Sequence, residues 1–312
     1  MRLRALAVSA LCVVCSGSVN AGAGGREAFV FTSLAGDARG AALGIGAAAL
    51  LDGEGAAWGN PAAAPLQLQY TAGLTHVSWT DGFFGETLTA MLPVGEEAVV
   101  GIGGFLFLHD PVPVTSEVLP EGTGALVRPL GVEASLLGAS FIVEGLSAGA
   151  SLRVVHEQFG DTAIEGMALD LGSVWMLDPT VAVGFAMRGF GGALLSRAVT
   201  DPFPLSFDGS VRYEAVGLLP MPVKAYAGAS LPVWGPSGGG IAVEVGDWYG
   251  AFLRGMVEMR EYDGFGWAIG IGGRRDQWNV DYTFAPVGEL GFVHRVGLTL
   301  KFSKSLTPGR GY

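Results

Sequence analysis

The chain has 312 residues, of which 50% are hydrophobic and 15% are charged, with 51 glycines and a formal net charge of −11. Glycine without a three-residue period excludes collagen, and the high apolar content excludes an intrinsically disordered chain. An acidic chain without a run of lysine and arginine is also unsuited to binding nucleic acid, because a nucleic-acid-binding surface needs clustered positive charge.

Residues 1–21 have the features of a cleaved secretory signal peptide. Arg2 and Arg4 supply a positively charged start, residues 5–14 form a short apolar stretch, and residues 19–21 offer the small side chains of a cleavage site. The apolar stretch is shorter than the ~20 residues that a membrane-spanning helix needs. Both cysteines lie within this segment, so the exported chain would have neither disulfides nor thiolate chemistry.

Residues 22–65 are rich in glycine and alanine and contain the longest apolar run that follows the predicted signal peptide. That run covers residues 40–51 and stops at Asp52, again too short for a membrane-spanning helix. From residue 66 onward the apolar side chains recur at every second position instead. This period is typical of a strand with one apolar and one polar face.

Fourteen segments with this alternation are predicted as strands. In the last of them Val296 and Leu298 share the apolar face, and Arg295 and Thr299 share the polar face. The connections at residues 110–130 and 189–204 are the longest predicted loops. The predicted strands are residues 66–79, 86–93, 98–108, 132–141, 146–157, 166–175, 181–188, 205–215, 223–231, 240–246, 253–260, 267–273, 278–284 and 294–302.

The composition of the two faces favours a membrane barrel over a soluble sandwich. The polar face is rich in glycine, alanine and serine, which suit a crowded lumen, and the apolar face is rich in the side chains that suit lipid. A sheet in lipid must close, because exposed backbone groups there find no hydrogen-bond partners. We therefore predict an all-β fold: a transmembrane antiparallel β-barrel of about 14 strands over residues 66–302. Residues 303–312 would form a C-terminal extension.

Two stretches near the ends of the chain carry motifs in a fixed order. Residues 34–64 place an acidic pair, an aromatic residue and Asn-Pro-Ala after a glycine- and alanine-rich run, and residues 278–302 place a Pro-x-Gly-Glu-Leu-Gly turn before a strand that begins His-Arg. Together they resemble the FadL superfamily of outer-membrane proteins, in particular its PorV/PorQ-type members. The matching positions are Ala38, Arg39, Gly44, Ile45, Gly46, Asp52, Glu54, Trp58, Asn60, Pro61, Ala62, Pro286, Gly288, Glu289, Leu290, Gly291, His294 and Arg295.

The resemblance implies a fourteen-stranded barrel whose lumen contains residues 22–65 as a hatch. The expected hatch or ligand residues are Asp52, Glu54, Trp58, Asn60 and Pro61. In FadL-like transporters the hatch controls the passage of hydrophobic ligands, whereas PorV-like barrels serve as partners or shuttles in protein secretion. No metal or other cofactor is implied.

Charged residues on the polar faces are expected to line the lumen. Asp52 and Glu54 are expected to pair with Arg254, Arg260, Arg295 or Lys301, because a charge in a partly dry lumen needs a partner. The alternative is a solvated polar lumen without a specific ligand. The candidate lumen charges are Arg153, Asp170, Glu244, Arg254, Glu258, Arg260, Asp281, Arg295 and Lys301.

Two sequence matches point to catalysis only weakly. Residues 145–149 fit the Gly-x-Ser-x-Gly pattern of a hydrolase nucleophile, Ser147, but they open an alternating strand and not a strand-to-helix turn. Residues 44–49 resemble a dinucleotide fingerprint, but no strand precedes them. The four histidines lack metal-ligand spacing. We expect no catalytic residues and no enzyme.

The favoured function is passage or gating of small hydrophobic molecules across the outer membrane of a diderm bacterium. The first alternative is a PorV-like partner in the delivery of secreted proteins to the cell surface. The second is a soluble secreted β protein or an esterase that uses Ser147. The expected partners are outer-membrane lipid, the barrel assembly machinery, and a hydrophobic ligand or secreted proteins.

Overall fold

The computed structural model describes residues 27–34, 36–80, 82–194, 202–215, 221–261 and 264–302. The predicted signal peptide, residues 1–21, and the predicted C-terminal extension, residues 303–312, lie outside the described residues. Among the residues that are described, no helix is long and apolar enough to cross a membrane.

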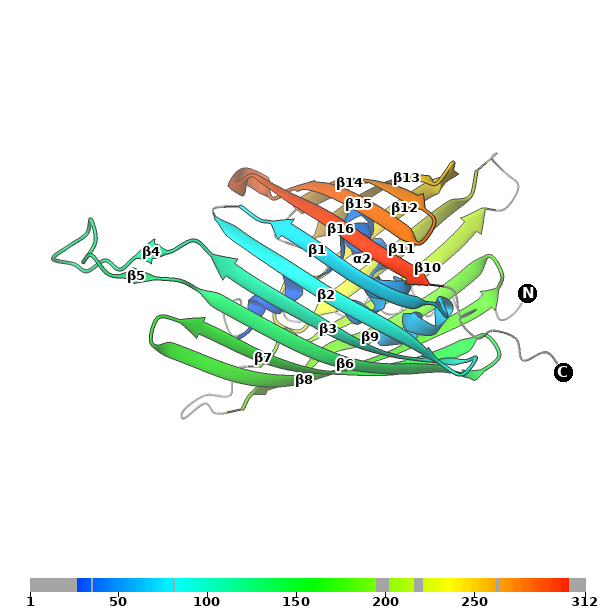
Figure 1. Ribbon diagram of the computed structural model, residues 1–312, viewed down its shortest axis with the longest axis horizontal. Coiled ribbons are helices and arrows are strands. Elements are labelled where there is room, and N and C mark those ends of the chain that lie inside the picture. The colour runs from blue at the N-terminus through cyan, green and yellow to red at the C-terminus, as the bar shows by residue number, and fades with distance from the viewer. Residues whose placement is uncertain are drawn as a thin grey trace.

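Fourteen antiparallel strands close into one barrel, which confirms the predicted fold class. Strand β1 pairs with β16 to close the wall, and β3 pairs with β6 because β4 and β5 belong to the connection between them (Figure 1). The wall strands are β1 (Tyr70–Ser78), β2 (Phe83–Val94), β3 (Ala98–His109), β6 (Leu130–Val143), β7 (Leu146–Phe159), β8 (Thr162–Asp178), β9 (Val181–Ala193), β10 (Ser206–Ala215), β11 (Val223–Pro232), β12 (Gly238–Trp248), β13 (Ala251–Arg260), β14 (Gly264–Arg275), β15 (Trp278–Pro286) and β16 (Phe292–Phe302).

The outer face of the barrel is apolar, as the alternation predicts. On β14, Ile269 and Ile271 are 53% and 57% exposed, whereas Ala268 and Gly270 beside them are buried. Aromatic side chains gather toward both ends of this exposed face, for example Trp278 where β15 begins and Phe292 where β16 begins. An apolar belt with aromatic ends is what the hydrocarbon core and its two interfaces select.

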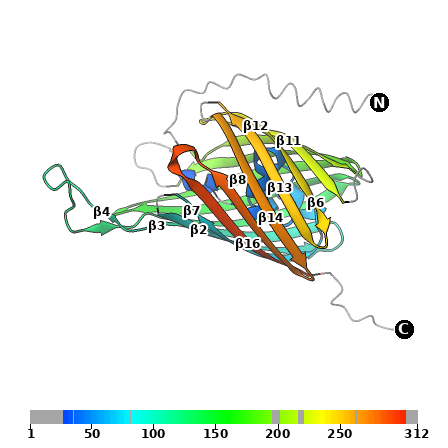
Figure 2. The same ribbon diagram turned by 90° about the horizontal axis from the view of Figure 1, so that it is seen from above.

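Several strands run further than predicted at the end of the barrel that carries the long connections. Strand β9 continues to Ala193, five residues beyond the predicted end at residue 188, and β2 begins at Phe83, which pairs with His109. Hydrogen bonding between neighbours extends these strands where the alternation of side chains has already stopped. Within the predicted loop 110–130, β4 (Val112–Pro113) and β5 (Leu126–Val127) pair as a hairpin arm that projects beyond the barrel (Figures 1 and 2).

Residues 27–69, here called the lumen segment, lie inside the barrel and contain four short helical elements. These are η1 (Val30–Leu34), α2 (Ala38–Ala47), η2 (Gly53–Ala57) and η3 (Pro61–Leu66). Helix α2 lies against β10 to β16, and η3 lies against β6, β7 and β8 (Figure 1). Asp37 caps α2 by accepting a hydrogen bond from the Gly40 amide, at 2.7 Å, and Gly44 kinks the helix with a φ of 51°. The segment is therefore short turns of helix that follow the inner wall.

Candidate functional site

Asn60 fastens the lumen segment to two wall strands. The side chain is fully buried, and its Nδ2 shares two N–H groups among the carbonyl oxygens of Ala49, Ser173 and Phe185, at 2.9, 3.1 and 3.1 Å. Its Oδ1 accepts a hydrogen bond from the Ala62 amide at 3.0 Å and so caps η3. Pro61 follows at the first position of η3, where its missing N–H leaves no bond unmade.

Wall glycines let the lumen segment approach the strands this closely. A Cβ atom at Gly172 on β8 would overlap Asn60 Oδ1, and one at Gly184 on β9 would overlap the Ala49 carbonyl oxygen. A Cβ atom at Gly149 on β7 would lie 2.7 Å from the Ala62 amide nitrogen. These glycines are needed for space, because the backbone of the segment occupies the volume of the absent side chains.

Arg39 of α2 joins the segment to a chain of buried charges on the wall. Its guanidinium donates to both carboxylate oxygens of Glu244 on β12, at 2.8 and 3.1 Å, and to Asp52 Oδ1 at 2.5 Å. Arg254 on β13 donates to the same Glu244, at 2.7 Å, and to Asp281 on β15. Side-chain exposures of 5% for Arg254 and 8% for Glu244 make this a dry network, in which losing one partner is costly.

This pairing differs from the one expected for Asp52. Its partner is Arg39 of the same segment, and not Arg254, Arg260, Arg295 or Lys301. Arg39 lies closer because α2 folds back over the chain that follows it. The adjacent cation holds the pKa of Asp52 down to about 2, against a burial that would raise it.

Glu54 lies against β16, and no cation among the described residues is bonded to it. Its Oε1 accepts a hydrogen bond from the Thr299 hydroxyl at 2.5 Å, while Lys301 donates to Gln67 at 3.2 Å. Burial, together with the nearby carboxylate of Asp37, raises the pKa of Glu54 to about 8.

The other predicted lumen charges are paired within the wall or bound to the segment's backbone. Arg153 makes a bidentate pair with Glu133, at 2.8 Å for both bonds, and lies 3.6 Å from Asp170. Glu258 pairs with Arg260 at 3.0 Å. Arg295 donates to the Leu34 carbonyl oxygen at 3.0 Å, beside the start of α2.

Several charged residues of the site, among them Arg39, Glu133 and Arg188, were not among the predicted site residues. Arg39 is the only cation in residues 34–64, which is a usable signal beside Asp52 in an apolar segment. Glu133 occupies a lumen-facing position of its strand, so the alternation alone would have found it. Arg188 donates to Asp208 at 2.7 Å and to the Trp58 carbonyl oxygen at 3.2 Å, and no sequence pattern indicates that contact.

Ser147 has a structural contact and no catalytic one. Its hydroxyl is fully buried and donates to the Ala62 carbonyl oxygen at 2.6 Å, so it helps to hold η3 against β7. No hydrogen bond to a histidine is seen for it among the described residues. Within the described part of the chain, no group of three or more His, Cys, Asp or Glu side chains is arranged to hold a metal ion.

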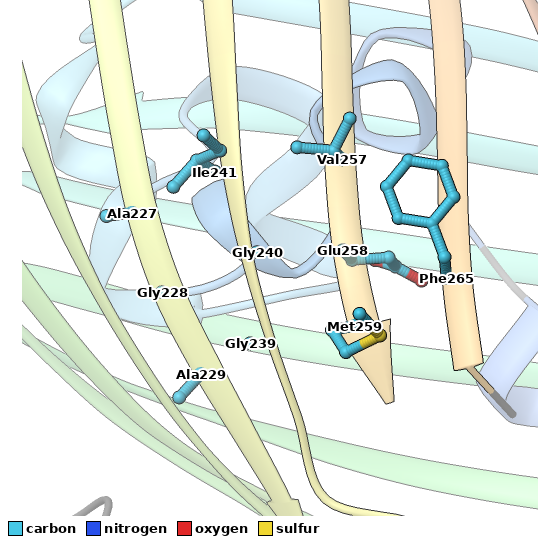
Figure 3. Close-up of a pocket in the computed structure, with 10 residues that line it drawn as sticks. All are labelled: Ala227, Gly228, Ala229, Gly239, Gly240, Ile241, Val257, Glu258, Met259 and Phe265. Carbon is cyan, nitrogen blue, oxygen red and sulfur yellow. The ribbon is translucent and has the colours of Figure 1, made fainter. Parts of the chain in front are cut away.

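An apolar pocket of about 480 Å³ lies on the outer face, over β11 to β14 (Figure 3). Its rim is made by exposed apolar side chains such as Ile241, Met259 and Phe265, and its floor by Gly228, Gly239 and Gly240. The lumen segment lies directly behind this floor, since a Cβ at Gly228 would come 2.6 Å from the Ile45 carbonyl oxygen. At this place only the backbone of the strands separates the outer pocket from the lumen segment.

No protein-family model and no curated protein sequence matches the chain. Among solved structures, the chain is similar to the toluene transporter TbuX of Ralstonia pickettii, with a TM-score of 0.63 and 13% identity over 86% of this chain and 98% of that one. It is similar to the toluene transporter TodX of Pseudomonas putida, with a TM-score of 0.60 and 12% identity over 85% and 96% of the two chains.

A Pseudomonas aeruginosa FadL homologue gives a TM-score of 0.56 and 11% identity over 86% of this chain and 98% of that one. At such low identities the likeness concerns the fold. The closed fourteen-stranded barrel described above therefore resembles these three solved structures in its fold.

Proposed function

We propose that the chain is an outer-membrane barrel through which small hydrophobic molecules pass, with the lumen segment as its hatch. The observation that carries the proposal is the segment itself, which lies within the lumen and is fastened to the wall by Asn60 and Arg39. The apolar outer face supports a place in lipid. Structures of the same fold are described as toluene transporters, which supports a hydrophobic cargo.

Passage by this route is passive. A molecule enters from the end with the long connections and meets the apolar side chains around η1. It leaves when part of the segment shifts, or through a lateral gap in the wall. No step requires a cofactor or a change of covalent bonds.

The proposed location requires export and assembly. Residues 1–21 would direct the chain across the inner membrane, and the barrel assembly machinery would insert the strands into the outer membrane. The test is cell fractionation combined with gel migration before and after heating. A chain recovered in the outer membrane, with migration that changes on heating, supports the location, whereas a chain recovered in the soluble fraction overturns it.

The cargo is tested by uptake of labelled toluene into a deletion strain, the same strain carrying the wild-type chain, and the same strain carrying an empty vector. We expect uptake to fall on deletion and to return only with the chain. Uptake of a labelled sugar serves as the control and should not change. Equal toluene uptake in all three strains would overturn the proposed cargo.

A PorV-like role in protein secretion is the second candidate, and the β4–β5 arm favours it. The arm projects beyond the barrel and exposes apolar side chains, with Val118 exposed by 86% and Leu126 by 65%, a surface suited to contact with another protein (Figure 2). Loss of surface delivery of secreted proteins on deletion, with toluene uptake unchanged, would favour this role over transport.

A further inference from the structure

One buried arginine of the inner wall has no partner in the described part of the chain. Arg212 on β10 is 7% exposed, and its Nε is buried without a hydrogen-bond acceptor. Its Nη1 and Nη2 atoms also donate to no described residue, but they are accessible to solvent. A buried polar group that lacks a protein partner indicates a water molecule or an ion as its partner.

The two other arginines that are equally buried in the described residues have carboxylates as partners. Arg153 donates to Glu133 at 2.8 Å, and Arg254 donates to Glu244 at 2.7 Å. Such pairing is expected, because a buried charge without a counterion is costly. Arg212 has the same burial but no carboxylate bonded to it among the described residues, which indicates a counterion from outside the chain.

Lys224 on β11 brings a second cation to the same part of the inner wall. Arg212 pairs with Tyr226 in the register of β10 and β11, and Lys224 lies two residues before Tyr226 on the same face. Diagonal neighbours of this kind lie about 7–8 Å apart, which two long side chains can bridge through one shared ligand. Lys224 is half-buried and makes no ion pair with a described residue.

Tyr226 adds a hydroxyl group to the two cations. Its side chain lies directly across from Arg212 and is 4% exposed, and its ring packs in one cluster with Leu43 and Ala47 of α2. The hydroxyl has no hydrogen-bond partner among the described residues and is accessible to solvent. The ring is therefore fixed by apolar packing, while the hydroxyl is available to a ligand.

The carboxylates around these donors do not bond to them. Lys224 lies across from Glu214 on β10 and from Glu244 on β12, but it forms an ion pair with neither. Glu244 and Asp52 are both bonded to Arg39, at 2.8 and 2.5 Å. Burial raises the pKa of Asp52, and Arg39 and then Lys224 lower it, which places the Lys224 ammonium near the lumen segment. The donors of the two wall cations are therefore unoccupied by the described carboxylates.

We propose that Arg212, Lys224 and Tyr226 form a binding site for a phosphate group. The planar guanidinium matches two phosphate oxygens, and the ammonium and the hydroxyl each donate to a further oxygen. A carboxylate has only two oxygens and would leave one of these donors unused. The site lies toward the end of the barrel opposite the β4–β5 arm, where β10 ends at Ala215. It adds a polar ligand to the lumen and does not depend on the proposed hydrophobic cargo.

The test is isothermal titration calorimetry of inorganic phosphate against the detergent-solubilised full chain, in chloride buffer at constant ionic strength. R212M and K224M should each bind phosphate about tenfold more weakly, because each removes a charged donor. E214Q removes the carboxylate that faces Lys224 and should bind phosphate about threefold more tightly. Arg274, near the same end of the barrel, is 46% exposed and paired with Asp247, so R274M is the matched control and should bind as the wild type does.

Thermal unfolding gives a second measurement of the same binding. Phosphate should raise the Tm of the wild type and of R274M, because a ligand that binds only the folded chain stabilises it, and should leave the Tm of R212M unchanged. Gel migration before and after heating confirms that each variant has formed the barrel.

Glycerol 3-phosphate, titrated in the same way, distinguishes the two sources of a phosphate group. Tighter binding of this ester than of inorganic phosphate assigns the site to phosphate esters, and weaker binding assigns it to the free ion. Equal affinities of R212M and the wild type for phosphate would overturn the site. Tighter binding of acetate than of phosphate would overturn the phosphate class.

Discussion

Replacing Asn60 with alanine should release the lumen segment from the wall without unfolding the barrel. The substitution removes two donated bonds, shared among three carbonyl oxygens, and the bond accepted from Ala62. At about 1 kcal/mol for each of three net hydrogen bonds, the docked segment loses ~3 kcal/mol. Since 1.4 kcal/mol corresponds to a factor of ten, amide exchange in residues 38–66 should accelerate roughly 100-fold.

Hydrogen–deuterium exchange measured by mass spectrometry on the detergent-solubilised chain gives this number directly. The variant N60D keeps the acceptor that caps η3 but turns an oxygen toward three carbonyl oxygens, so it should be at least as damaging as N60A. Asn279 on β15 faces the lumen, and its Oδ1 accepts no hydrogen bond from any described residue, so N279A is the matched control. Unchanged protection of residues 38–66 in N60A would refute the reasoning, and so would an equal loss of protection in the strands.

Three further outcomes are expected from the same structure. R39A should accelerate amide exchange of the segment more than R39K does, because only alanine leaves Glu244 and Asp52 without the positive charge at position 39. The two variants should differ by ~1–2 kcal/mol in the free energy of releasing the segment. G172A should raise conductance in planar bilayers by displacing the segment, whereas G138A, where no atom lies within 4 Å of the new Cβ, should not. The pKa of Glu54 is about 8 in the folded chain and 4.5 ordinarily, so the docked segment binds a proton that the released segment loses. The protection of the segment against amide exchange should therefore fall as the pH rises between roughly 5 and 8, and E54Q should abolish that dependence.

The sequence is sufficient to predict the barrel because period-two alternation is a local property. Each of the fourteen predicted segments corresponds to a wall strand, and the outward position of residues such as Ile269 follows directly from the period. The strand ends are less predictable, because a strand continues as long as its neighbour offers hydrogen bonds. Strand β9 therefore reaches Ala193 through residues whose side chains no longer alternate.

The sequence predicts a contact of the site only where a single residue in a recognisable motif makes it. Asn60 stands out because it belongs to an Asn-Pro-Ala motif, although its two wall contacts on β8 and β9 are far away in sequence. The partner of Asp52 could not be found from spacing, because the fold of α2 decides which cation reaches it. Gly172 and Gly184 are two of 51 glycines, and only the position of the segment shows which ones must remain without a side chain.

The unequal anchoring of the lumen segment limits how a molecule can pass. Expelling the whole segment would break the buried pairs of Arg39 and the contacts of Asn60, at a combined cost of at least ~6 kcal/mol. That leaves fewer than about one chain in ten thousand open at any moment. Displacing η1 and the two residues before it breaks the backbone bonds of Ala28 and Phe29 and the bond from Arg295 to the Leu34 carbonyl oxygen, but none of the buried pairs of Arg39. Passage should therefore begin with η1 while α2 to η3 stay in place, so cross-linking α2 to the wall should leave uptake of labelled toluene intact and cross-linking η1 should abolish it.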